Sequence, residues 1–161
     1  NNLISQSKQF DEISNEIENN FTYCWYYFFE FIFIFTNRWK KQVGDLEIFS
    51  VGMVIMWHSL VKKSYQENGW NFSNWKKNKI IVPETGVNTM SISEITHIPR
   101  PTVVRKLNYL LKNKYISVNK KKLFNVNMQD KTLTDTIKLQ EKNVLSLSHL
   151  IFKIFGQINI K

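Results

Sequence analysis

The chain has 161 residues, of which 14% are aromatic, and its 22 Lys and Arg against 13 Asp and Glu give a formal net charge of +9. This length suffices for one hydrophobic core or for one small domain with helical appendages, and the positive charge favours an anionic partner, a nucleic acid or a membrane surface. Cys24 is the only cysteine and residues 1–10 lack a secretory signal pattern, which excludes an intrachain disulfide and makes a cytoplasmic location the expectation.

Two long helices are predicted in the N-terminal segment, residues 1–67, which we expect to serve the core and dimerisation. The first should end around Trp39 to Val43, and its apolar stripe recurs at steps of three or four residues: Phe10, Ile13, Ile17, Phe21, Cys24, Phe28, Phe31 and Phe35. Gly44 is expected to stop it, and Asp45 to be the N-cap of the second helix. That helix should end at Asn68–Gly69, and its predicted stripe is Leu46, Phe49, Met53, Met56, Trp57 and Leu60.

Residues 68–90 form a connecting segment that is expected to hold an extra turn or a short strand. Its lysine cluster, Lys76, Lys77 and Lys79, is interpreted as a solvated face, with an auxiliary DNA contact as the alternative. Residues 90–92 are a candidate third strand beside the hairpin described below.

A short helix followed by a tight turn is predicted next. Ser91 and Glu94 have the spacing of a capping box, so the helix should begin near Ile92. Pro99 and Pro101 prevent it from continuing, which places the turn at residues 97–99. Ile92, Ile95 and Ile98 are expected to hold this helix against the next one.

A second helix is predicted from residue 102 to residue 113, with Pro101 tolerated in its first turn. At 100° per residue one face is apolar and is expected to pack: Val103, Val104, Leu107, Leu110 and Leu111. The opposite face is expected to be free: Thr102, Arg105, Lys106, Tyr109, Lys112 and Asn113.

After Tyr115 the apolar period changes to two, which predicts a hairpin with strands at residues 116–118 and 124–126 and a tip of three lysines, Lys120 to Lys122. Between Ile95 and Gln129 there are eight basic residues and no acidic one. Such a concentration of positive charge is typical of nucleic-acid binding, because each neutralised phosphate releases condensed counterions.

The I-P-R-P-T-V-V-R-K-L turn and the short basic hairpin resemble bacterial winged-helix transcriptional regulators, and helices on both sides make the chain most similar to the MarR type. The resemblance implies a homodimer whose recognition helices enter successive major grooves of an inverted repeat. It also implies a small aromatic effector. The family's wing commonly carries Asp-x-Arg, whereas the tip here is Lys120 to Lys122, so we expect the tip to contact phosphates rather than to read the minor groove.

The predicted DNA-binding residues follow from these elements. The N-terminus of the second helix is the end that meets base edges, and Arg105 is the best candidate for a bidentate contact to guanine. Tyr109 is expected near the DNA backbone and the wing lysines on phosphates. The full set is Arg100, Pro101, Thr102, Arg105, Lys106, Tyr109, Lys120, Lys121 and Lys122.

A last long helix is predicted in the C-terminal segment, residues 128–161, beginning between Asp130 and Thr132 and running toward Gln157. Its stripe is spaced for pairing with another helix: Val144, Leu147, Leu150, Ile151, Ile154, Phe155 and Ile158. Amphipathic helices at both ends of the chain favour a dimer, with packing inside their own domain as the alternative.

The run of residues 21–35 is apolar on nearly every face, but it is shorter than the ~20 residues that a membrane span needs, and Glu30 interrupts it. Burial in a dimer is therefore favoured over membrane association. Small-molecule binding by Trp25, Tyr26, Trp57 and Trp70 is a further hypothesis. No metal site is expected from His58, His97 and His149, and no catalytic residue or cofactor is predicted.

The predicted fold is therefore mainly α with a small β-hairpin wing: a winged helix-turn-helix module at residues 91–127, flanked by long N- and C-terminal helices. The predicted function is sequence-specific binding of double-stranded DNA by a homodimeric transcriptional regulator. The alternatives are a winged helix that contacts RNA or protein, and a membrane-tethered regulator.

Overall fold

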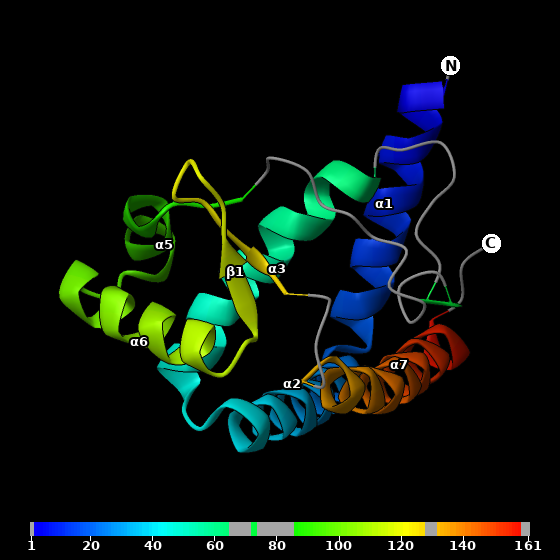
Figure 1. Ribbon diagram of the computed structural model, residues 1–161. Coiled ribbons are helices and arrows are strands. Elements are labelled where there is room, and N and C mark those ends of the chain that lie inside the picture. Colours follow the sequence, from blue (N-terminus) through cyan, green and yellow to red (C-terminus); the bar gives the residue numbers. More distant parts are fainter. Residues whose placement is uncertain (1, 65–71, 74–85, 128–131, 159–161) are drawn as a thin grey trace. The chain divides into compact units, whose positions relative to one another are not determined.

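The structure is a computed structural model that describes residues 2–64, 72–73, 86–127 and 132–158. Its described part is mainly helical, with one antiparallel hairpin (Figure 1). The elements are α1 (Asn2–Asn19), α2 (Phe21–Val43), α3 (Leu46–Ser64), α5 (Thr89–Thr96), α6 (Arg100–Lys112), β1 (Ile116–Val118), β2 (Phe124–Val126) and α7 (Thr132–Gln157). The chain divides into two compact units, which we name the helical unit (Asn1–Arg38 with Gln140–Lys161) and the hairpin unit (Trp39–Leu139).

The first predicted helix is interrupted at Asn20, so the expectation of one continuous helix is wrong at this residue. The Asn20 side-chain amide donates to the carbonyl oxygen of Glu16 at 3.0 Å, which already accepts from the Asn20 backbone N–H at 3.1 Å. Asparagine side chains compete in this way with the backbone for hydrogen bonds. Helix α2 then ends at Val43, within the predicted range.

Helices α2 and α7 meet in the helical unit through long polar and aromatic side chains. Arg38 Nη1 donates to the carbonyl oxygen of Lys142 at 2.8 Å and to Ser146 Oγ at 2.7 Å. The ring of Tyr27 lies edge-on to that of His149, with 5.9 Å between centroids. The predicted start and end of the last helix are confirmed by α7.

The core of the hairpin unit forms where α3 and α6 cross. Among its buried side chains are Ile48, Val51, Val54 and Ile55 of α3, Ile92 of α5, Val103, Leu107 and Leu110 of α6 and Ile116 of β1. The predicted stripe of α3 is wrong, because Leu46 and Trp57 are 47% and 58% exposed while the β-branched residues lie inside. This helix is apolar on more than one side, so its period does not single out one face. Its predicted end at residues 68–69 lies outside the described residues.

The turn between α2 and α3 has the predicted signals. Gly44 has a φ of 106°, a conformation that favours glycine and ends α2. Asp45 Oδ1 accepts from the Ile48 backbone N–H at 2.7 Å, which makes Asp45 the N-cap of α3. Trp39 and Val43 before the turn are buried, so the turn is fixed on both sides.

The first helix of the predicted pair begins earlier than expected. Asn88, not Ser91, is the N-cap of α5, and its Oδ1 accepts from the Ser91 backbone N–H at 2.9 Å. The predicted capping box is therefore wrong, since an equally good cap stands three residues upstream. His97 closes the helix in a left-handed conformation, and the tight turn at residues 97–99 is confirmed.

The predicted hairpin is confirmed, with the register Ile116↔Val126, Ser117↔Asn125 and Val118↔Phe124. Val87 also pairs with this hairpin, through an isolated antiparallel bridge to Phe124. Residues 90–92, the predicted third strand, lie in α5 instead. At the tip, Asn119 Oδ1 accepts from the backbone N–H groups of Lys121 and Leu123, both at 3.0 Å.

Candidate nucleic-acid interface

Helix α6 presents one buried face and one exposed polar face. Val103, Leu107 and Leu110 are buried in the hairpin unit. Spacings of four, three and four residues place the exposed side chains on the opposite side, in a row that we name the outward stripe: Pro101, Arg105, Asn108 and Lys112.

The outward stripe is rotated around α6 relative to the predicted free face. Val104 and Leu111 were expected to pack, but Val104 is exposed and Leu111 is half-buried. Thr102 was expected to be free and is half-buried. Asn108 was missed by the sequence analysis, although its spacing from Arg105 was a usable signal.

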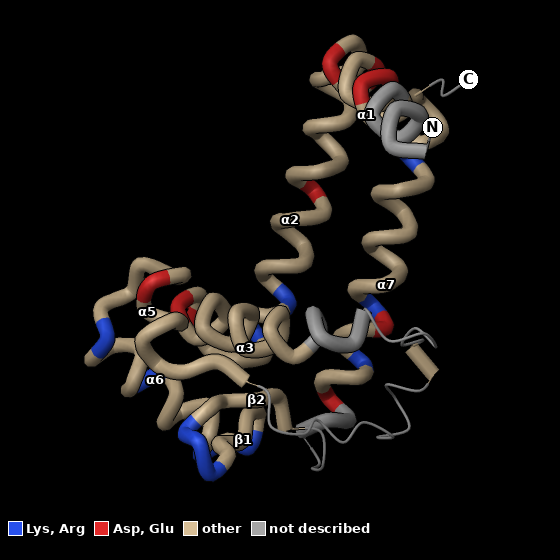
Figure 2. Tube along the Cα trace, turned by 90° about the horizontal axis from the view of Figure 1, so that it is seen from above, with Lys and Arg blue, Asp and Glu red and all other residues tan. Residues whose placement is uncertain are grey.

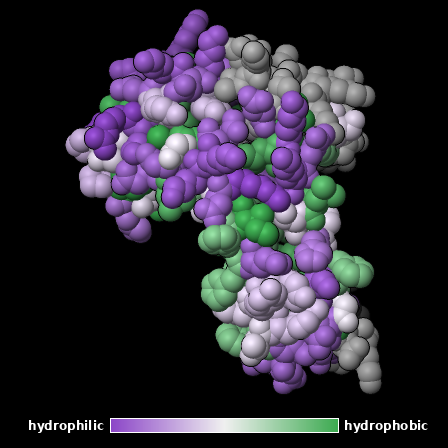
Figure 3. Space-filling view, turned by 90° about the horizontal axis from the view of Figure 1, so that it is seen from below, coloured by the Kyte–Doolittle hydropathy of each residue, from purple (hydrophilic) through white to green (hydrophobic). Residues whose placement is uncertain are grey.

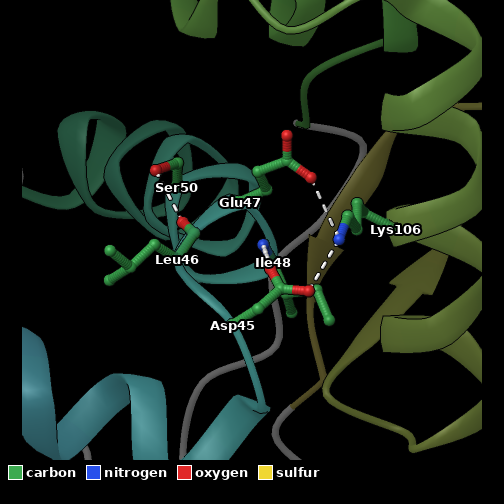
Figure 4. A network of polar contacts seen from close by, with 6 residues as sticks. All are labelled: Asp45, Leu46, Glu47, Ile48, Ser50 and Lys106. Carbon is green, nitrogen blue, oxygen red and sulfur yellow. Dashed lines mark hydrogen bonds and ion pairs between the residues drawn. The ribbon is translucent and has the colours of Figure 1, made fainter.

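Lys106 is the main correction to the predicted face. Its side chain is only 12% exposed, and its Nζ lies 2.6 Å from Asp45 Oδ2 and 3.1 Å from Glu47 Oε2 (Figure 4). The expectation that Lys106 is free on the outward face is therefore wrong, because two carboxylates at the N-terminal end of α3 form ion pairs with it.

The ion pair between Lys106 and Asp45 shifts the pKa of each of these two groups in the direction that keeps it charged. The hydrogen bond to Asp45 raises the pKa of Lys106 above its ordinary value, against the opposing effect of partial burial. Partial burial disfavours the charged form of Asp45, but hydrogen bonds from Lys106 and from the Ile48 backbone N–H outweigh it and lower the pKa of Asp45.

The other predicted contact residues of α6 lie at its surface. Arg100 and Pro101 are exposed at the N-terminus of the helix, and Arg105 is exposed one turn further on. Tyr109 is exposed as well, although its hydroxyl reaches the turn before α3, where a β-carbon on Gly44 would lie 3.7 Å from it.

The hairpin tip adds a second basic surface in the same unit. Lys120, Lys121 and Lys122 are all exposed, and Figure 2 shows Lys and Arg on α6 and at this tip. The whole stretch from residue 95 to residue 127 contains no Asp or Glu. The hairpin unit thus carries exposed positive charges both on α6 and on the adjoining β1–β2 hairpin.

The helical unit contains a cavity of about 250 Å³ between α2 and α7. Apolar and charged side chains both line it, including Phe31, Ile34, Leu145, Glu30 and Arg38. Trp25, Tyr26 and Trp57, considered for ligand binding from the sequence, are exposed outside this cavity, and Trp70 lies outside the described residues.

The described residues include three histidines and one free, buried cysteine, Cys24. They contain no group of three His, Cys, Asp or Glu side chains placed to hold a metal ion. Burial raises the pKa of the Cys24 thiol and disfavours its reactive thiolate form. None of the helices, as far as they are described, is both long and apolar enough to span a membrane.

Comparison of the chain with protein-family models, with curated proteins and with solved structures found no match.

Proposed function

We propose that this protein is a sequence-specific, double-stranded DNA-binding transcriptional regulator. In this proposal α5, α6 and the β1–β2 hairpin act as a winged helix-turn-helix module, with α6 in the major groove and the hairpin tip on the phosphate backbone. The observation that carries it is the outward stripe of α6, which displays Arg105 and Lys112 while Val103, Leu107 and Leu110 anchor the helix from behind.

The shape and chemistry of this surface favour duplex DNA over the alternatives. The major groove of B-form DNA admits an α-helix, whereas the major groove of A-form RNA is too deep and narrow for side chains to read. A partner protein would require an apolar centre on the contact surface. The outward stripe instead combines two cations with an amide, and these groups pair with guanine, adenine and phosphate.

We further propose that the protein works as a homodimer through α2 and α7. Within the described part of the helical unit, only Cys24, Leu150 and Ile158 are buried apolar residues. Thirteen large apolar side chains of α2 and α7 are at least 38% exposed: Phe21, Trp25, Tyr26, Phe28, Phe29, Ile32, Phe33, Val144, Leu145, Leu147, Ile151, Phe152 and Phe155. Figure 3 shows apolar residues at the molecular surface.

The exposed apolar area matches what a stable dimer needs. Aromatic side chains bury about 150–250 Å² each, so the thirteen residues expose on the order of 1,000 Å². The largest apolar patch of an ordinary monomer is about 300–600 Å², and a stable interface buries about 800 Å² per partner. A symmetric dimer would also carry two copies of α6, as binding to an inverted repeat requires.

Selection of bound fragments from random duplex DNA tests the proposal. We expect recovered sequences with inverted symmetry and half-sites about 10 bp apart, since paired recognition helices enter successive major grooves. Recovery of sequences without any common motif, or retention of RNA in preference to duplex DNA, would contradict it. Lys138→Ala, which removes one exposed charge from α7, is the control for non-specific charge effects.

The cavity between α2 and α7 is the site that we propose for a small aromatic effector. Phe31, Ile34 and Leu145 supply apolar walls for a ring, and Glu30 and Arg38 supply groups of opposite charge. Calorimetric titration with monocyclic aromatic acids and amines tests it. We expect binding that Ile34→Trp abolishes by filling the cavity, and equal heats for the variant and the unaltered chain would exclude this site.

A further inference from the structure

Lys106 differs from the other cations of α6 because its ammonium group is already ion-paired within the protein. The side chains of Arg100, Arg105 and Lys112 are exposed, whereas Lys106 is 12% exposed and contacts two carboxylates. On the helix circumference it lies about 100° from Arg105, on the flank of α6 rather than on its outward stripe. A helix in the major groove has phosphates along its flanks, so an uncommitted lysine at this position would meet one.

The backbone that carries the two carboxylates is held in place independently of Lys106. Asp45 is the N-cap of α3, bonded to the Ile48 backbone N–H at 2.7 Å, and Glu47 stands in the first turn of the same helix. The positive end of the helix dipole favours acidic groups there. Buried Trp39, Val43 and Ile48 fix the surrounding backbone. A pair of anionic oxygens on this backbone stands 2.6 Å and 3.1 Å from the ammonium, at distances that are ordinary for its hydrogen bonds to phosphate.

We propose that Asp45 and Glu47 act as internal substitutes for a DNA phosphate that withhold Lys106 from the nucleic acid. This inference rests on the proposed DNA binding, and it adds that the ion pairs of Lys106 limit the affinity for DNA. While the ion pairs persist, Lys106 releases no counterion from DNA, and its charge offsets one of the two negative charges beside the interface. Lys106 is thus a positioning residue that holds α6 against the N-terminus of α3, and not a contact residue.

The variant Asp45→Asn/Glu47→Gln removes both negative charges with little change of shape. Asparagine is as good an N-cap as aspartate, so α3 keeps its start. We expect the released Lys106 to reach a phosphate, which steepens the slope of log K against log salt by about 0.9. Binding at low salt should become several-fold tighter. The measurement is fluorescence anisotropy of a labelled selected duplex over a salt series, with the melting temperature of each variant recorded.

Two further variants distinguish the release of Lys106 for phosphate contact from the mere loss of repulsion between the two carboxylates and the DNA. Lys106→Met alone should keep the salt slope of the unaltered chain, because no phosphate contact is lost. Adding Lys106→Met to the double variant should return the slope to that same value. A steeper slope that persists in the triple variant, or a slope reduced by Lys106→Met alone, overturns the proposal. Glu47→Gln alone leaves the cap untouched and serves if the double variant does not fold.

The two proposals fail in different ways. Absence of duplex binding by the unaltered chain contradicts the proposed function itself. Normal duplex binding, together with a folded double variant whose slope and affinity are unchanged, contradicts only the withholding of Lys106.

Discussion

Arg105 and Lys121 are exposed cations at two different places of the proposed interface, one on α6 and one at the hairpin tip. Arg105→Ala should cost about 1–3 kcal/mol on the selected sequence and relax the choice of base at one position, because a bidentate contact to guanine is lost. Lys121→Ala should weaken binding to all sequences alike and reduce the salt slope by about one. Competition between selected and random duplexes measures both. Equal losses on both duplexes for Arg105→Ala would refute base reading by this residue.

Asp45 gives the hairpin unit a contact that is sensitive to acid. Its pKa is lowered in the folded chain, so the folded state binds fewer protons than an unfolded chain with an aspartate pKa of about 3.9. The stability that Asp45 contributes is present above about pH 4 and is lost as the pH falls through the folded value. Thermal unfolding of Asp45→Asn, which keeps the cap, should therefore show a smaller drop in Tm below about pH 4. Parallel curves for the two chains would contradict this.

The ion pairs of Lys106 were beyond sequence reasoning for a physical reason. Helical periodicity orders residues around one helix, and Lys106 falls at the border between its two faces. Which way it turns depends on Asp45, 61 residues earlier in the chain. The central buried residues of α6, Val103, Leu107 and Leu110, were predictable because they recur at helical spacing and are flanked by charges.

At the scale of elements, α3 is the helix on which prediction and structure differ most. Ile55 is fully buried, whereas the larger aromatic side chain of Trp57 is 58% exposed. Ile55→Ala should cost about 2–5 kcal/mol of unfolding free energy through the cavity that it leaves. Trp57→Ala should cost no more than about 1 kcal/mol. Chemical denaturation followed by circular dichroism measures both, and a larger loss for Trp57→Ala would restore the predicted stripe.

Element boundaries were predictable where a single residue has no competitor. Gly44 is the first glycine in the chain and Asp45 follows it directly, and both have their predicted roles. Asn88 and Ser91 are both good caps within one turn, and local chemistry did not choose between them. Asn20 interrupts a long amphipathic pattern that continues on both sides, so the pattern alone concealed the break.

At the scale of the whole molecule, the helical unit leaves apolar faces on two helices. Apart from Leu145, which lines the cavity between α2 and α7, the exposed apolar residues of these helices lie on sides that do not face the cavity. One flat contact cannot cover both sides. In the proposed dimer the α2 and α7 helices of two copies therefore interleave, which buries more area than a single contact and favours a dimer that does not dissociate readily.

Phe152 offers a direct test of this assembly, since its side chain is 72% exposed on α7. Phe152→Glu should shift the protein toward the monomer, because a carboxylate would be buried without a partner in the interface. Trp57→Glu is the matched control, an exposed aromatic residue of the hairpin unit that carries the same new charge. Sedimentation equilibrium at several concentrations reports the state. An unaltered chain that is monomeric throughout would rule the dimer out.

The bonding of the hairpin tip has a consequence for how the lysines respond to proteases. Asn119 accepts two backbone N–H groups of the tip through its side chain, and its own N–H donates to Leu123 at 3.0 Å. A protease that cuts after lysine must first straighten the chain into its own cleft, and these bonds oppose that opening. Trypsin should therefore spare the peptide bonds after residues 120–122 in the intact chain. Asn119→Ala should make this tip an early point of cleavage while the three lysines remain in place.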